Sequence, residues 1–272
     1  MNIRNHRLAD AAYVRTPNRG GALEPDTIVI HYTAGPSAES AVQALTNPDH
    51  KASAHIVVDT DGSLTQLVPF NVVAWHAGKS RHLDRSGLNS VSIGIEIVNA
   101  GRLSRSGSTF FSWFNKEYPV EAVMKAVHRN EQEPTYWHRY TEAQVAATAA
   151  LCEALVKKYG IRYILGHEEI SPGRKIDPGP AFPLDKLRNR ILAGDARSES
   201  GDPAPAETPV AGVVTASKLN IRSGPSTAQA AIARPLPNGT PVRILEKTGG
   251  WYKVSVNVEG WVSADYIEET GG

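Results

Sequence analysis

Apolar positions near the middle of the chain follow two patterns that are typical of strands. Residues 27–31 are short and mostly β-branched, which predicts a buried strand that ends at His31. Residues 91–99 alternate, with a valine and three isoleucines on one face and small or polar side chains on the other. Glu96 lies on the second face, so it is free to enter a polar site.

A hairpin and a helix are predicted between these two strands. Residues 54–58 and 63–68 flank the pair Asp61-Gly62, which strongly favours a tight turn between paired strands. Residues 38–45 have the composition and spacing of a helix.

The clearest helix is predicted over residues 141–159. Thr141 and Gln144 have the spacing of a capping box, and Gly160 suits a helix end. A further strand is expected at 161–165. The mixed order of strands and helices predicts an α/β domain with a central mixed sheet flanked by helices.

Residues 102–139 have no clear period and are rich in aromatic and charged side chains. We expect a long insertion beside the sheet that lines a groove, with a short helix within 121–129.

A stretch rich in Pro, Ala, Gly and Glu divides the chain at residues 193–211, and its composition is that of a semi-stiff linker. It separates a first domain at 1–192 from a second at 212–272. The second domain consists of short β runs separated by Gly, Pro and Asn turns, which predicts a small all-β barrel.

Composition narrows the classes of function. The formal net charge of +1 gives no electrostatic reason to expect nucleic acid or an anionic membrane as a partner. No run approaches the roughly 20 apolar residues of a membrane span, and residues 1–15 lack the apolar core of a secretory signal. The single cysteine, Cys152, is expected to be a small buried apolar residue.

The candidate metal-binding residues lie at or after the ends of predicted strands. His31 ends one strand, His167 follows another, and Asp177 lies in the loop beyond it. Two imidazoles and one carboxylate form a catalytic zinc set, which leaves a fourth position for a water of lowered pKa. The spacing alone is weak, because no compact motif is present and a histidine is commonly a structural residue.

The first domain resembles the zinc-dependent N-acetylmuramoyl-L-alanine amidases, a family that also contains the peptidoglycan recognition proteins. The resemblance covers residues 27–182, and its motifs occur in the expected order. They are IVIHYT at 28–33, SAHIVVD at 53–59, AWHAG at 74–78, NSVSIGIE at 89–96, GHEEISPGRK at 166–175 and DPGP at 177–180.

The resemblance implies roles for individual positions. His31, His167 and Asp177 look like the three Zn²⁺ ligands, Glu96 like the catalytic acid/base and Lys175 like the cationic stabiliser. Some relatives place a catalytic tyrosine before the second-motif histidine, where this sequence has Ala54, so a tyrosine base is doubtful.

Other polar and aromatic side chains have weaker claims. Four of them are candidates for substrate contact, and the alternative for each is a structural role. They are Tyr32, His55, Trp75 and His76. Two further tryptophans, Trp113 and Trp137, suit either a sugar- or peptide-binding surface or core packing.

The second domain resembles bacterial SH3-like wall-binding domains, through LNIRSGPS at 219–226, GWYKV at 250–254 and GWVSADYI at 260–267. The two resemblances together imply hydrolysis of the amide between N-acetylmuramic acid and L-alanine in peptidoglycan or muropeptides, at the bacterial cell wall. Two alternatives stay open, a non-catalytic peptidoglycan recognition protein and a zinc peptidase that cuts within the stem peptide. The oligomeric state and the route of export, or a recycling role inside the cell, also stay open.

Overall fold

The computed structural model describes residues 1–195, 210–222, 224–227, 229–248, 250–256, 259–263 and 267–269. It forms two compact units, Met1–Ser200 and Gly201–Gly272. Helix α4 (Leu184–Asp195) continues past residue 192, where the linker was expected to begin. The rest of the predicted linker, at 196–209, lies outside the described residues.

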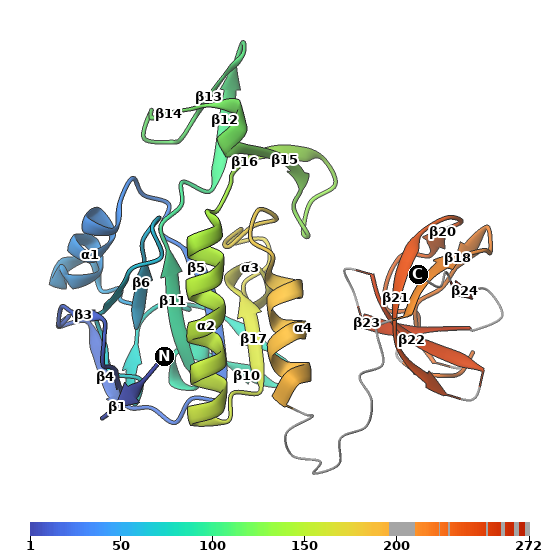
Figure 1. Cartoon of the computed structure of the whole chain (residues 1–272), viewed down its shortest axis with the longest axis horizontal. Helices are drawn as coiled ribbons and strands as arrows, with labels where there is room; N and C mark the ends of the chain where they lie inside the picture. The colour runs from blue at the N-terminus through green and yellow to red at the C-terminus, as the bar shows by residue number, and fades with distance from the viewer. Residues whose placement is uncertain are drawn as a thin grey trace. The chain divides into compact units, whose positions relative to one another are not determined.

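A six-stranded mixed sheet forms the centre of the first unit (Figure 1). Strands β17, β5, β11 and β6 are mutually parallel, and β6 and β7 form the antiparallel hairpin predicted at Asp61-Gly62. This agrees with the predicted fold. In sheet order the strands are β17 (Tyr163–Gly166), β5 (Thr27–Tyr32), β11 (Ser92–Ile97), β6 (Ile56–Val58), β7 (Leu64–Gln66) and β3 (Ala12–Tyr13).

Helices cover both faces of this sheet. The isoleucine stripe of β11 packs in the main core with α2 (Glu142–Tyr159) and α4, where Cys152 is buried as expected. Helix α1 (Ala38–Thr46) packs near Val57 and Val98, whose side chains lie on the opposite face of the sheet. The side chain of Thr141 accepts a hydrogen bond from the Gln144 backbone and completes the capping box that starts α2. No helix in the described part of the chain is both long enough and apolar enough to cross a membrane.

Short elements complete the first unit. The strands are β1 (Ile3–Arg4), β2 (Arg7–Leu8), β4 (Arg19–Ala22), β8 (Val72–Ala74), β9 (Arg81–His82) and β10 (Arg85–Ser86). Single helical turns lie at Pro48–His50, Leu88–Ser90 and Val120–Ala122, and the four-residue helix α3 (His167–Ile170) follows β17.

The insertion is a second sheet, not an irregular loop, and it projects beyond the carboxyl end of the central sheet (Figure 1). The helix expected within 121–129 is wrong. Residues 123–127 form β15, which pairs along its whole length with β16, and this pairing decides their conformation. The strands, in sheet order, are β14 (Glu117–Tyr118), β13 (Thr109–Phe111), β12 (Arg102–Ser106), β16 (Pro134–His138) and β15 (Val123–Val127).

The second unit is all β, as predicted. Its main sheet is antiparallel, in the order β23-β22-β21-β18-β24, and β19 pairs with β20. Small aliphatic side chains, among them Val214, Ile221 and Val254, form its core. The strands are β18 (Val210–Val214), β19 (Lys218–Leu219), β20 (Leu236–Pro237), β21 (Pro241–Thr248), β22 (Trp251–Ser255), β23 (Glu259–Ser263) and β24 (Ile267–Glu269).

Candidate metal centre

Three neighbouring parallel strands bring the predicted site residues to one edge of the sheet. Glu96 of β11 is in register with His31 of β5, so their side chains lie on the same face. Gly166, the last residue of β17, pairs with Ile30, which places His167 next to His31. This face is opposite to the one covered by α2 and α4, because Val29 packs in a separate cluster from Ile28 and Ile30.

His31, His167 and Asp177 converge on a single point. The Nδ1 atoms of the two histidines lie 3.0 Å apart, and each lies 3.0 Å from Oδ2 of Asp177. All three residues are buried, and the three form a group whose candidate ligand atoms lie within 4.8 Å of one another. Sequence positions 31, 167 and 177 are thus brought together as the motifs predicted.

The hydrogen bond at the far side of the His167 ring sets its tautomer. Nε2 of His167 lies 3.1 Å from the carbonyl oxygen of Ala77, which can only accept. Nη2 of Arg174 lies 3.3 Å from the same nitrogen, but its two protons have shorter contacts, with Ser171 Oγ at 2.7 Å and the Lys79 carbonyl oxygen at 2.8 Å. Nε2 therefore carries the proton, and in the neutral ring Nδ1 is left with a bare lone pair. That lone pair faces His31 and Asp177.

His76 sets the tautomer of His31 in the same way. Nε2 of His76 lies 3.3 Å from the backbone oxygen of Ser92, so it is the protonated nitrogen, and Nδ1 of His76 must accept. Nδ1 of His76 lies 3.0 Å from Nε2 of His31, which therefore donates. Nδ1 of His31 is then also unprotonated. Such second hydrogen bonds are what orient histidine ligands in metal sites.

The charge states agree with this assignment. Burial, together with the neighbouring His167, lowers the pKa of His31 to about 4. Burial opposes the ionisation of Asp177, but the hydrogen bonds and positive charge that the two histidines supply when protonated outweigh burial and hold the pKa of its carboxyl group below the ordinary value. Two imidazole nitrogens and a carboxylate oxygen that converge on one point fit a divalent cation such as zinc.

Glu96 is the neighbouring group that lacks a partner. Its Oε2 atom is buried and has no hydrogen-bond partner among the described residues. Burial and the charge of Asp177 raise the pKa of Glu96 well above the ordinary value, and the charge of Lys175 opposes this rise. The charge of Lys175 also helps to lower the pKa of His31. Glu96 is thus a carboxyl group with perturbed acidity beside the cluster.

The remaining predicted residues occupy different environments. His55 is buried; its Nδ1 accepts from the Gly94 backbone and its Nε2 donates to Val72, which supports the structural alternative. The ring of Tyr32 packs against Gly101. The backbone N–H of Trp75 donates a hydrogen bond to Ser53 Oγ, and its carbonyl oxygen accepts one from the Ser53 backbone. His76 had been predicted only as a candidate for substrate contact. The AWHAG motif marked its position but not its contact with His31.

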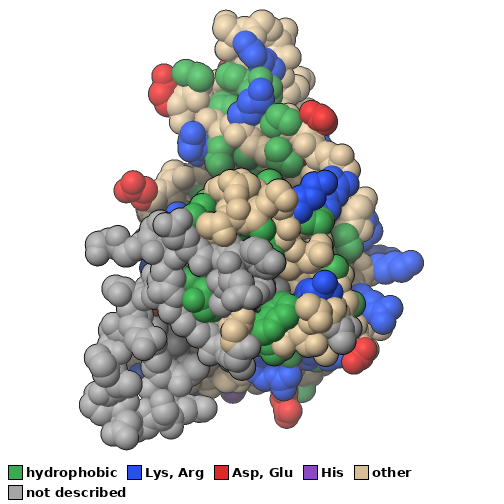
Figure 2. Space-filling model, turned by 90° about the vertical axis from the view of Figure 1, so that its right-hand side faces the viewer, with side chains coloured by type: hydrophobic (Ala, Val, Ile, Leu, Met, Phe, Trp, Pro, Cys, Tyr) green, Lys and Arg blue, Asp and Glu red, His purple; other side chains and the backbone are tan. Residues whose placement is uncertain are grey.

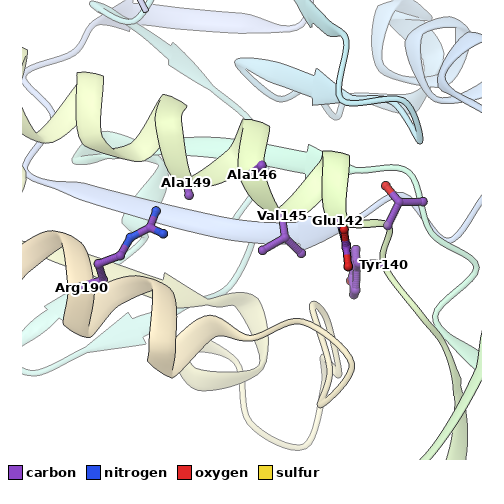
Figure 3. A pocket seen from close by; sticks show the side chains of 7 residues that line it. Tyr140, Glu142, Val145, Ala146, Ala149 and Arg190 are labelled. Atoms are coloured by element: carbon purple, nitrogen blue, oxygen red, sulfur yellow. The ribbon is translucent and has the colours of Figure 1, made fainter.

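A pocket lies away from the cluster of histidines and carboxylates. Residues of α2, the segment before it and Arg190 of α4 line a pocket of about 320 Å³ (Figure 3). Its walls include Val145, Ala146 and Ala149, and it contains none of the clustered histidines or carboxylates. It is therefore separate from the candidate metal centre.

Comparison with known proteins agrees with the geometry. The family model for N-acetylmuramoyl-L-alanine amidases matches residues 21–180, and the chain belongs to this family. The bacterial SH3 domain model matches residues 217–268. Each unit of the structure therefore corresponds to one recognised domain.

Two curated relatives come from Escherichia coli strain K12. The chain is 33% identical over 190 residues to the N-acetylmuramoyl-L-alanine amidase AmiD, covering 66% of this chain and 55% of that protein. It is 33% identical over 144 residues to the 1,6-anhydro-N-acetylmuramyl-L-alanine amidase AmpD, covering 52% of this chain and 58% of that protein. The chain thus spans a little over half the length of each. A crystal structure of AmpD superposes with a TM-score of 0.52 at 26% identity, over 70% of this chain and 99% of that one.

Proposed function

We propose that the chain hydrolyses the amide bond between N-acetylmuramic acid and L-alanine in peptidoglycan or its fragments, with Zn²⁺ as cofactor. The observation that carries this proposal is the convergence of two unprotonated Nδ1 atoms and one carboxylate beside the unpartnered Glu96. Family membership and the named activities of AmiD and AmpD support the same bond as the target.

His31, His167 and Asp177 would hold the zinc ion. When bound, zinc supplies a Lewis acid that lowers the pKa of water and polarises a carbonyl group. His76 and the Ala77 carbonyl keep the two imidazoles in the tautomer that can bind the ion.

Glu96 and Lys175 would have separate roles in the reaction. Glu96 takes a proton from the attacking water and returns it to the nitrogen of the departing L-alanine, so that water adds to the carbonyl and the C–N bond breaks. Lys175 places a positive charge near the developing oxyanion. The raised pKa of Glu96 suits a group that must both accept and donate a proton near neutral pH.

The SH3-like unit would bind peptidoglycan and hold the first unit at its substrate. Tethering a catalytic domain to a binding domain raises the local substrate concentration without any change in the active site. The bacterial cell wall is then the site of action.

Two variants test the division between metal binding and turnover. His167→Ala should lose both zinc and hydrolysis of muropeptides, because two ligands no longer hold the ion. Glu96→Gln should keep stoichiometric zinc, measured by elemental mass spectrometry, and lose at least about a hundredfold in kcat. Normal turnover by Glu96→Gln would remove Glu96 from the reaction, and full activity of zinc-free His167→Ala would exclude the metal.

A further inference from the structure

The insertion 102–138 is a compact module with its own core. Leu103, Phe110, Tyr118 and Val123 pack together in a hydrophobic cluster distinct from the main core. A segment with its own packed side chains holds its shape. Its surface carries hydrophobic, basic and acidic side chains in the side view, where it forms the upper part of the molecule (Figure 2).

One end of the insertion is fixed beside His167. Glu168, the next residue, is buried, and its carboxylate contacts His128 Nε2 at 2.7 Å and Arg129 Nε at 2.8 Å. The same carboxylate accepts from the Gly179 backbone at 3.0 Å, and the Glu168 backbone donates to the Asp177 carbonyl at 2.8 Å. The insertion is therefore held against the segments that carry His167 and Asp177.

The other end of the insertion is fixed near His31. Nε1 of Trp113 donates to the carbonyl oxygen of Ala34 at 2.7 Å, three residues after His31. The turn that carries Trp113 is closed by hydrogen bonds between Ser112 and Lys116, and Asn115 adopts a left-handed conformation there. The indole is thus held in one orientation beside the segment that follows His31.

Trp113 is nevertheless 73% exposed, the largest exposed hydrophobic side chain of the described residues. The ring of Phe114 lies perpendicular to the indole, with ring centroids 5.6 Å apart, and most of the indole surface is accessible. Its only donor is already bonded to Ala34. The side chain therefore offers a ligand flat apolar surface and no hydrogen bond.

We propose that Trp113 is a carbohydrate-stacking residue and that the insertion forms one wall of the substrate cleft. The apolar C–H face of a pyranose ring matches such a surface, whereas a stem peptide, with its amides and carboxylates, requires donors that this indole lacks. The ring bound there is the saccharide on the glycan side of the scissile amide. This inference rests on the proposed amidase activity.

Kinetics on two substrates test the assignment. One is a muramyl peptide, and the other is a D-lactoyl-L-alanyl peptide, which keeps the scissile amide and lacks the sugar. Trp113→Ala should raise KM for the muramyl peptide about five- to tenfold with kcat within twofold, and leave KM for the lactoyl peptide unchanged. The KM of Trp113→Phe for the muramyl peptide should lie between those of the wild type and Trp113→Ala. Val120 is also exposed on the insertion, and Val120→Ala should have the KM of the wild type.

A binding titration separates this inference from the amidase proposal. The peptide-free disaccharide of N-acetylglucosamine and N-acetylmuramic acid should shift the indole N–H resonance of Trp113 in the wild-type chain. Its affinity should fall about five- to tenfold in Trp113→Ala. Equal affinity of the two proteins, or equal KM rises on both peptides, would overturn the stacking role. Failure of the wild type to cleave either peptide would count against the amidase alone.

Discussion

At the scale of single residues, the site depends on the small size of Gly94. A side chain at this position would place its first carbon 2.3 Å from Cγ of His76, closer than van der Waals contact allows. The absence of a side chain lets the His76 ring lie between Ser92 and His31. The tautomer of one proposed ligand therefore depends on a glycine two residues before Glu96.

His76→Ala is expected to weaken zinc binding about 10- to 100-fold, because Nε2 of His31 loses its acceptor and the proton is free to move to Nδ1. Competition with a chromophoric chelator measures this affinity. His76→Asn keeps an acceptor near the position of Nδ1 and should recover part of the loss. Wild-type affinity in His76→Ala would show that His31 does not need this contact.

The sequence predicted which residues lie close together better than it predicted their hydrogen bonds. Motifs placed His31, His167 and Asp177 at strand ends and loops, and alternation put Glu96 on the polar face. Tautomers could not be predicted, because they depend on the Ala77 and Ser92 carbonyls, whose positions follow from backbone geometry that motifs do not encode.

At the scale of elements, the buried contacts between the insertion and α3 have consequences for stability. The ring of His128 is stacked on Trp137, with centroids 5.6 Å apart, and its Nε2 contacts Glu168. Trp137 in turn packs where a side chain on Gly179 would lie. These contacts connect β16, the end of β15, α3 and the loop after Asp177.

His128→Ala should lower the free energy of unfolding by about 1–3 kcal/mol, because buried Glu168 loses one partner and keeps Arg129 and Gly179. Chemical denaturation followed by circular dichroism measures the change. His50→Ala, an exposed histidine of the same unit, should change stability by less than about 0.5 kcal/mol. Equal small effects of both changes would mean that the insertion is not braced by this contact.

Element prediction succeeded where the pattern was local and failed where pairing was decisive. The capping box and terminal glycine defined α2, and Asp61-Gly62 defined a hairpin. The stretch 121–129 has no such local signal. It becomes β15 only because β16, which follows later in the chain, supplies the partner strand.

At the scale of the whole molecule, the two units are expected to divide catalysis from anchoring. Removal of residues 211–272 should leave hydrolysis of soluble muropeptides within about twofold of the full chain, because the candidate metal centre lies wholly in the first unit. Binding to isolated cell-wall sacculi should fall at least about tenfold in a co-sedimentation assay. Unchanged sedimentation of the truncated chain would show that the SH3-like unit does not anchor it.

The most direct test of the account is mass spectrometry of purified muropeptides after incubation with the full chain, with and without a chelator. We expect free stem peptide with L-alanine at its amino end, lost on chelation and restored by zinc. Cleavage within the stem peptide would identify a zinc peptidase instead. Intact muropeptide that remains tightly bound to the chain would identify a recognition protein and contradict the proposed catalysis.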